Sequence, residues 1–274
     1  MVGEIFVDPW RYQLHLEVWL LIAFLVGSYI YVVRVLGPRA VPAGEPIVTR
    51  RQLVCFITGI LIMFLSTDWP MHDIAEEYLY SVHMFQHMSL TYFMPPLVVL
   101  ATPEWFVRVL VGNGRAYRAL RFFTFPVRAG LLFNLGIVVS HIPGVVNASV
   151  SNGPLHYFVH VILVLTSILM WMPVCGPERS FRLQYGGMMI YLFLMSVVPT
   201  VPAAWLTFAE GSVYKHYDIP VRVWGLSVTT DQQLAGAVMK SAGSMFLWTI
   251  IVVIFFRRFI GRFFAEASYS KESN

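Results

Sequence analysis

Charged residues are scarce in this chain, at 12% of its 274 residues, about half the share that soluble domains carry. Apolar residues reach 57%, and the mean hydropathy is +0.66. Cysteine is also scarce, since only Cys55 and Cys175 occur and they form no CxxC pair. These absences exclude an ordinary soluble domain, a disulfide framework and a thiolate metal cluster.

Several catalytic and binding motifs are missing. The chain has no P-loop, no CxxCH haem-attachment motif and no H-E-x-x-H, because neither of its two HxxxH pairs contains the glutamate base of a zinc protease. It also has no basic stripe with interleaved aromatics. We therefore expect no nucleic-acid partner, and we assign the net charge of +4 to loops at a membrane surface.

Long apolar runs are what the chain does contain, and each approaches the ~20 residues that a membrane-spanning helix needs. Their spacing predicts one all-α, polytopic membrane domain over residues 1–274, a bundle of seven transmembrane helices. The first run follows a segment without a basic n-region, so we expect a retained span rather than a signal peptide. The predicted spans are about 17–37, 52–67, 81–101, 129–146, 155–174, 187–208 and 232–256.

The basic residues predict the orientation of these spans. If seven spans alternate, fifteen of the nineteen lysines and arginines fall on one side, which the positive-inside rule makes cytoplasmic. The N-terminus is then outside and the C-terminus cytoplasmic. The acidic 68–80 connector is also outside. The fifteen residues are Arg34, Arg39, Arg50, Arg51, Arg108, Arg115, Arg118, Arg121, Arg128, Arg179, Arg182, Arg257, Arg258, Arg262 and Lys271.

All eight histidines fall on or near the outer side of this topology. His83 and His87 are four residues apart in the first turns of span 3, so they share one helix face. His156 and His160 repeat this spacing in span 5, which enters from the same side. Polar residues inside a membrane usually face the bundle or a cavity, and neutral imidazole binds copper, zinc, iron and nickel. The two pairs therefore predict a metal site.

Further residues extend this prediction. His141 at the outer end of span 4 and His72 in the acidic connector are candidate ligands. Met84 and Met88 beside the first pair favour Cu(I), although most of the thirteen methionines are expected to be packing residues. Asp68 and Asp231 either orient imidazoles or are solvated loop residues. A single membrane histidine such as His15 or His216 is more typical of an interhelical hydrogen bond.

Two rival interpretations follow from the same residues. Lys240 lies about 13 Å into the seventh span, as in a retinal protein, but span 3 has no mid-membrane carboxylate to act as a counter-ion. Lys240 then either snorkels or pairs with an internal polar group.

A haem ligated by one histidine from each helix is the second rival. Pro95 and Pro96 are expected to break span 3, and Pro199 and Pro202 to interrupt span 6.

Three segments carry a family resemblance: DWPMHDIAEEYLYSVHMFQHMSLTYFMPPLVVLATPEW, SHIPGVVNASVSNGPLHYFVHVILVLTSILMWMPVCGP and DQQLAGAVM. Together they resemble the CtaG family of caa3-type cytochrome c oxidase assembly factors. The resemblance implies a seven-span protein that helps supply copper to the CuB centre of the oxidase. The positions that match the family motifs are His83, His87, His141, His156, His160, Asp231, Gln233 and Met239. The chain departs from the family after Met239, where Lys240 to Gly243 replace Trp and Pro-Gly.

The combined prediction is a metallochaperone rather than an enzyme, in the plasma membrane of a bacterium, with its metal site facing outward. We expect copper, as Cu(I), with zinc or haem as less favoured alternatives. The expected partners are the nascent oxidase subunit I, other copper chaperones and membrane lipid. A haem-handling protein and a metal-free assembly scaffold stay open as alternatives. The predicted site is His83, His87, His156, His160, His141 and His72, with Asp68, Asp231, Met84, Met88 and Met239 as auxiliary residues.

Overall fold

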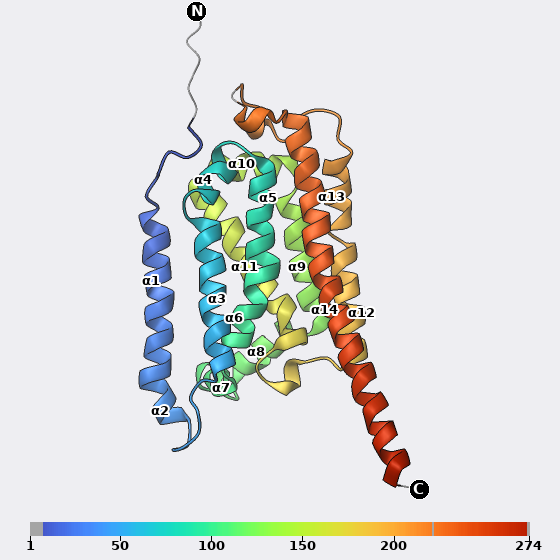
Figure 1. The fold of residues 1–274 in the computed structure, drawn as a ribbon. Coiled ribbons are helices and arrows are strands. Elements are labelled where there is room, and N and C mark those ends of the chain that lie inside the picture. Colours follow the sequence, from blue (N-terminus) through green and yellow to red (C-terminus); the bar gives the residue numbers. More distant parts are fainter. Residues whose placement is uncertain (1–7, 221, 273–274) are drawn as a thin grey trace, which may run out of the picture.

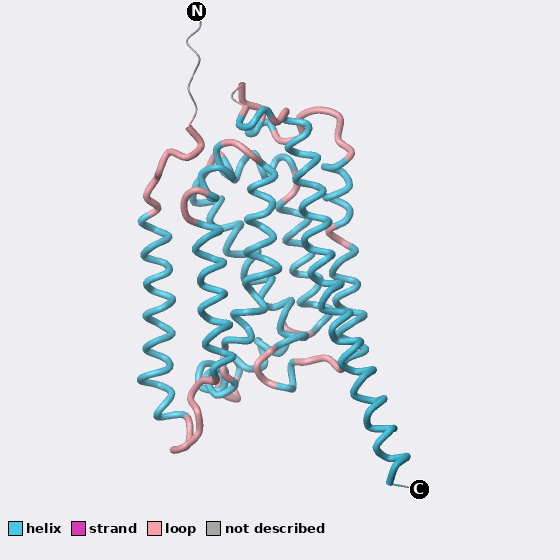
Figure 2. The backbone as a smooth tube through the Cα atoms, in the orientation of Figure 1, coloured by secondary structure: helices cyan, strands magenta, loops and turns pink. Residues whose placement is uncertain are grey.

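The computed structural model describes residues 8–220 and 222–272, with side chains described as far as Gly261. Within these residues the chain forms helices and connecting loops, with no strand (Figure 1; Figure 2). The predicted all-α class is confirmed. The scarcity of charge favours a chain that lies in lipid. A backbone in lipid must satisfy its own N–H and C=O groups, and a helix does so within one segment.

Among the described residues, five helices are long and apolar enough to cross a membrane, and bent pairs bring the number to as many as seven. One bent pair joins Tyr80–Ala101 to α7 (Glu104–Val111) at 87°, and the other joins α8 (Arg115–Phe123) to α9 (Pro126–Ser140) at 66°. Each predicted apolar run overlaps one of these segments. The five are Leu16–Ala40, Arg50–Thr67, Gly153–Cys175, Tyr185–Thr207 and Val228–Gly261.

The third predicted span is interrupted by a short π-helix rather than by a sharp break. It consists of α5 (Tyr80–Met88), the π-helix η2 (Ser89–Phe93) and α6 (Met94–Ala101). Pro95 has no N–H to donate, so the carbonyl of Thr91 loses its helical partner. The hydroxyl of Ser167, from the neighbouring α11, donates to that carbonyl instead. A neighbouring helix therefore makes the proline-containing segment tolerable at membrane depth.

The fourth predicted run, 129–146, is not one helix, and that boundary is wrong. α9 ends at Ser140, and a separate α10 (Pro143–Val150) follows. The residue before a proline is disfavoured in helical conformation, and Ile142 is extended, with φ −66° and ψ 127°. His141 therefore lies at the C-terminal cap of α9 and not within a continuous span.

The sixth span is interrupted as predicted, between α12 (Tyr185–Val197) and α13 (Thr200–Thr207). Lys240 reaches this interruption from α14 (Val228–Glu272). Its Nζ donates to the carbonyl of Ser196 at 3.2 Å and to the hydroxyl of Thr200 at 2.6 Å. The prediction that Lys240 pairs with an internal polar group is confirmed, and the lysine has a structural role at the helix break.

Close helix contacts hold α14 in the bundle. A Cβ on Gly236 would lie 2.5 Å from Thr207 Oγ1 and 2.6 Å from the carbonyl oxygen of Ala203, so α13 and α14 approach at a distance that only glycine permits. By contrast, α1 (Leu16–Tyr31) stands at the margin of the bundle, and Val18 is its one buried residue (Figure 1).

Short helices cover the two ends of the bundle (Figure 1). At one end lie α4 (Met71–Glu77), α10 and the 3₁₀ turns η4 (Lys215–Tyr217) and η5 (Val223–Gly225). This is called the histidine end below. At the other end lie α7, α8, α2 (Gly37–Ala40) and the 3₁₀ turn η3 (Arg179–Phe181). Three elements not yet given bounds are the π-helix η1 (Val32–Leu36), α3 (Arg50–Thr67) and α11 (Gly153–Cys175).

Candidate metal centre

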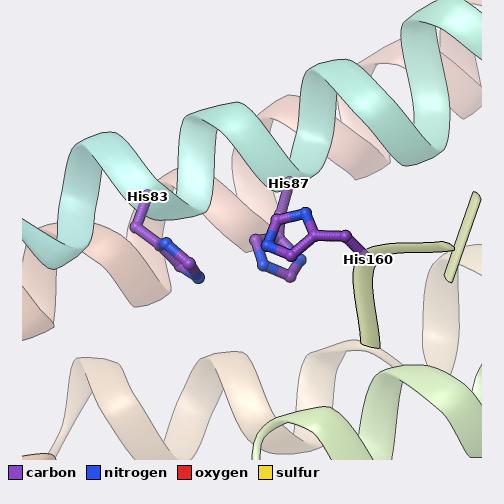
Figure 3. A group of neighbouring side chains, drawn as sticks. All are labelled: His83, His87 and His160. Atoms are coloured by element: carbon purple, nitrogen blue, oxygen red, sulfur yellow. The ribbon is translucent and has the colours of Figure 1, made fainter. Parts of the chain in front are cut away.

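The two predicted histidine pairs face each other at the histidine end. The ring centroids of His83 and His87 on α5 are 4.5 Å apart, and those of His156 and His160 on α11 are 4.4 Å apart. Across the two helices, the His87 and His160 rings are 4.7 Å apart. Figure 3 shows His87 and His160 side by side, with His83 one turn away along α5. The i, i+4 spacing gave each pair one face, and packing brought the two faces together.

The imidazole nitrogens and one carboxylate oxygen form two overlapping groups of candidate ligands. One group is His83, His87 and His160, and the other is Glu76, His156 and His160, each with ligand atoms within 4.8 Å of one another. At that spacing an ion at the centre is about 2.8 Å from each atom, against roughly 2.0–2.1 Å for a metal–imidazole bond. Side-chain shifts of less than an ångström therefore suffice for coordination.

His141 adds a fifth imidazole with a defined tautomer. Its Nδ1 lies 2.7 Å from the carbonyl oxygen of Ile137, and since a carbonyl can only accept, Nδ1 carries the proton. The Nε2 lone pair is then free, and this atom is buried without a hydrogen-bond partner among the described residues. The Nε2 of His160 is also buried without a hydrogen-bond partner among the described residues. Buried, unpartnered nitrogen atoms are costly unless something binds them.

Glu76 of α4 orients two of the imidazoles. Its Oε1 accepts from His83 Nδ1 at 3.0 Å and lies 3.2 Å from His156 Nε2. Burial raises the pKa of Glu76, but the two imidazoles outweigh this effect and lower it well below its ordinary value. An ionised carboxylate behind a ligating histidine fixes the ring and raises its basicity. The neutral His83 ring therefore carries its proton on Nδ1 and keeps the lone pair of Nε2 for a metal.

The role of Glu76 was not predicted from the sequence. The signal that could have found it is its position four residues after His72, in a connector that has four acidic residues and no basic one. That pattern places a carboxylate one turn below an imidazole on a short helix. It does not say which helix the carboxylate faces.

A small cavity of about 20 Å³ lies between the rings. Its walls include the five histidines together with Tyr80, Ser140 and Ser149. Because one water-sized probe needs about 10–15 Å³, the cavity has room for one ion or one water molecule. A porphyrin is far larger than this space.

The loop between α13 and α14 covers the cluster. Tyr214 donates to the carbonyl of His141 at 2.9 Å, and Tyr217 donates to the carbonyl of Ala75 at 3.0 Å. His216 lies with Nε2 3.1 Å from the carbonyl oxygen of Glu76. These bonds attach the loop to α4 and to the end of α9, so the cluster is closed from the histidine end.

His72 does not join either group of ligands. Its Nδ1 lies 3.2 Å from the Nε2 of Gln86, and its ring is 4.8 Å from the ring of His15. Burial lowers the pKa of His72. Asp68 is buried at the end of α3, with Oδ1 lacking a partner among the described residues. Its carboxylate makes no hydrogen bond to any described imidazole.

The methionines lie outside the cavity. Met84, Met88 and Met239 are fully buried in the apolar core. Met88 Sδ faces α14, 3.5 Å from the position that a Cβ on Gly243 would take. No methionine is among the described residues that line the cavity. The donor set consists of imidazoles and one carboxylate, without the thioether that the sequence suggested.

Residues 27–259 match the family of cytochrome c oxidase caa3 assembly factors, Caa3_CtaG. The chain belongs to this family. It is also 24% identical over 223 residues to uncharacterized proteins of Mycobacterium bovis and Mycobacterium tuberculosis, and 21% identical over 228 residues to one of Mycobacterium leprae. Each alignment covers 74% of this chain and 33% of the relative, so the chain spans about a third of the length of these relatives. No solved structure matches.

The DQQLAGAVM segment of the chain supports the centre through the backbone. Asp231 accepts from the N–H of Tyr80 at 2.7 Å and from the N–H of Ser81 at 3.0 Å, so it caps the helix that carries His83 and His87. Among the described residues its carboxylate has no hydrogen bond to an imidazole. Gln233 donates to the carbonyl of Ala209 at 3.2 Å, which holds the covering loop to α14.

Proposed function

We propose that this membrane protein binds copper in the histidine cluster and delivers it to the nascent subunit I of cytochrome c oxidase, toward the CuB centre. The family supports a role in oxidase assembly. The observation that carries the copper step is the buried cluster of five imidazoles, in which His141 and His160 keep unpartnered Nε2 atoms. Nothing in this role requires a bond to be broken, so the protein acts as a chaperone and not as an enzyme.

Copper suits the donor set better than the alternatives. Imidazole is a good ligand for copper, and divalent copper stands above zinc in the usual affinity order. The cavity of about 20 Å³ between the five rings has room for one ion and not for a haem. The absence of a lining methionine removes the thioether argument for Cu(I), but neutral imidazoles accept either oxidation state. We retain Cu(I) as the delivered form.

Release requires exchangeable ligands, and the two groups supply them. His160 belongs both to the group with His83 and His87 and to the group with Glu76 and His156. An ion that moves between the groups keeps one ligand throughout the step. Other copper chaperones are the expected donors, and the oxidase subunit is the expected acceptor.

The charge distribution supports a plasma-membrane protein with the histidine end outside. Basic residues are concentrated at the end that carries α7 and α8, including Arg115, Arg118 and Arg121 on α8. The positive-inside rule makes that end cytoplasmic. Copper then enters from the outer side of a bacterial membrane, and seven spans place the two ends of the chain on opposite sides.

Metal analysis of the purified protein tests this function. Wild type, His83→Ala/His87→Ala, His156→Ala/His160→Ala and the control His15→Ala are loaded with copper, washed and measured by inductively coupled plasma mass spectrometry with an absorption spectrum. We expect near-stoichiometric copper in wild type and control, and at least a tenfold loss in both double variants. Thermal unfolding in the same detergent shows that each variant is folded.

Two other outcomes would replace this proposal. A Soret band in the purified wild type, lost in the variants, would indicate a haem-handling protein. Absence of copper from loaded wild type, together with normal oxidase assembly in cells that carry either double variant, would leave a metal-free scaffold.

A further inference from the structure

A long apolar groove separates α1 from the rest of the bundle. Its volume is about 680 Å³, within the range of ligand-binding pockets. The walls come mainly from α1, α3, α6 and α11, with single residues from α4, α5 and α7, and typical residues are Leu25 on α1, Ile60 on α3 and Val164 on α11. The groove is not part of the histidine cavity, although His156 and His160 line both.

The shape of the groove restricts its occupant. Along α1 the lining residues extend from Glu17 to Val33, which is about 24 Å at 1.5 Å per residue. The groove is therefore elongated along α1 and lined almost entirely by apolar side chains, so a hydrocarbon chain laid along α1 suits it.

The end of the groove near the histidine cluster is polar. Gln86 lies there with 1% of its surface exposed. Its Nε2 donates to the carbonyl of Ser66 at 2.8 Å and points to His72 Nδ1, while its Oε1 has no partner among the described residues. Since His72 Nδ1 accepts, the neutral ring carries its proton on Nε2. The pair thus offers one N–H donor and one carbonyl acceptor.

The headgroup of the occupant must be uncharged. No lysine or arginine is among the described lining residues, and the carboxylate there is Glu17. A phosphodiester would lie near this negative charge without a cation to pair with it, which is unfavourable in a low-dielectric site. A ring with carbonyl or hydroxyl groups suits both Gln86 and His72.

We propose that this groove binds an isoprenoid quinone, with its single chain along α1 and its headgroup between His72 and Gln86. The headgroup then lies next to His156 and His160, and the chain closes the lateral route from the membrane to the histidine cluster. This binding site does not depend on the identity of the metal, or on whether a metal binds at all.

Retention of quinone by the purified protein tests the proposal. Wild type, Leu25→Trp/Val164→Trp and Phe24→Trp are purified in mild detergent, extracted and analysed by mass spectrometry. The double variant fills the groove, whereas Phe24 lies beside Leu25 in sequence, is 67% exposed and is not a lining residue. We expect quinone in wild type and Phe24→Trp, and about a tenfold reduction in the double variant.

Photo-labelling provides a second measurement that does not require the filled variant to fold. Wild type is labelled with an azido-substituted short-chain alkyl quinone, and the labelled peptides are sequenced. Label on the groove faces of α1 and α11, displaced by unlabelled alkyl quinone, supports the proposal. Label elsewhere, phospholipid in place of quinone in the extract, or equal retention by all three proteins overturns it.

Discussion

The carboxylate of Asp231 on α14 accepts a hydrogen bond from the backbone N–H of Tyr80 at 2.7 Å, at the first residue of α5. Two segments 151 residues apart in sequence are joined by this bond. A second bond, from the Ser81 N–H, satisfies another of the N–H groups that a helix leaves free at its start. Asp231 therefore sets the position of the helix that carries His83 and His87.

Replacement of Asp231 is expected to weaken the whole centre through this cap. Asp231→Ala removes a buried, charge-assisted cap and should destabilise the protein by about 2–3 kcal/mol. The measurement is thermal unfolding in detergent, with the largely exposed Asp218 as the matched control, Asp218→Ala. Equal midpoints for the two variants would contradict the role given to Asp231.

Glu76→Gln should reduce metal affinity while the fold is retained. The amide keeps the size of the side chain but cannot stabilise the N–H groups of His83 and His156 as a carboxylate does, and such substitutions cost roughly 10–100-fold in affinity. A competition titration against a chelator of known affinity measures this. The control is Glu77→Gln, an exposed neighbour that accepts from Gln13. Equal affinities in both variants would remove Glu76 from the centre.

His141 and His72 should behave differently. His141→Ala removes a buried free Nε2 from the cavity and is expected to lower copper affinity by at least about tenfold. His72→Ala leaves both ligand groups complete, so its affinity should stay within about threefold of wild type. The same titration compares them. A larger effect at His72 than at His141 would contradict this expectation and would indicate that His72 binds the metal.

Lys240→Met should destabilise the contact between α14 and the break in the sixth span. The methionine keeps the apolar stem but leaves the Ser196 carbonyl and the Thr200 hydroxyl without this donor, and interhelical bonds in membranes contribute about 0.6–1.7 kcal/mol. Thermal unfolding of Lys240→Met, Thr200→Val and the double variant forms a cycle. Strictly additive effects would show that the two side chains do not interact.

The attachment of α1 at the histidine end should depend on pH. His15 Nε2 lies 2.6 Å from Asp73 Oδ1, with Glu17 and the His72 ring beside it. Burial lowers the pKa of His15, but the hydrogen bond and charge of Asp73 outweigh this, so the pKa is raised above 6.5. The stabilisation is then complete below 6.5 and is lost as the pH rises through the raised value.

Hydrogen exchange in the first turn of α1, measured on metal-free protein across this pH range, checks this expectation. Protection should fall as the pH rises, after correction for the intrinsic rate. The variant His15→Phe should show weaker protection than wild type at low pH, and the difference should shrink as the pH rises through the raised pKa of His15. A wild type whose corrected protection is constant would contradict a charged His15 at low pH.

The sequence alone determined which segments form helices and which histidines share one helix face. Apolar runs specified helices because lipid leaves the backbone no other partner, and the spacing of His83 with His87, and of His156 with His160, placed each pair on one face. Prolines marked where spans three and six are irregular. These conclusions depend on neighbours within one helix, whose geometry is the same in any fold.

Only the tertiary structure decided which side chains meet across helices. Glu76, rather than Asp68 or Asp231, faces the imidazoles, and Met88 faces α14 although it follows His87 directly. His72 turns to Gln86 and away from the cluster. Distances between helices are set by packing at contacts such as Gly236 against α13, which no local spacing encodes. The sequence therefore determines the chemistry available at the histidine end, and packing determines which of those groups share one cavity.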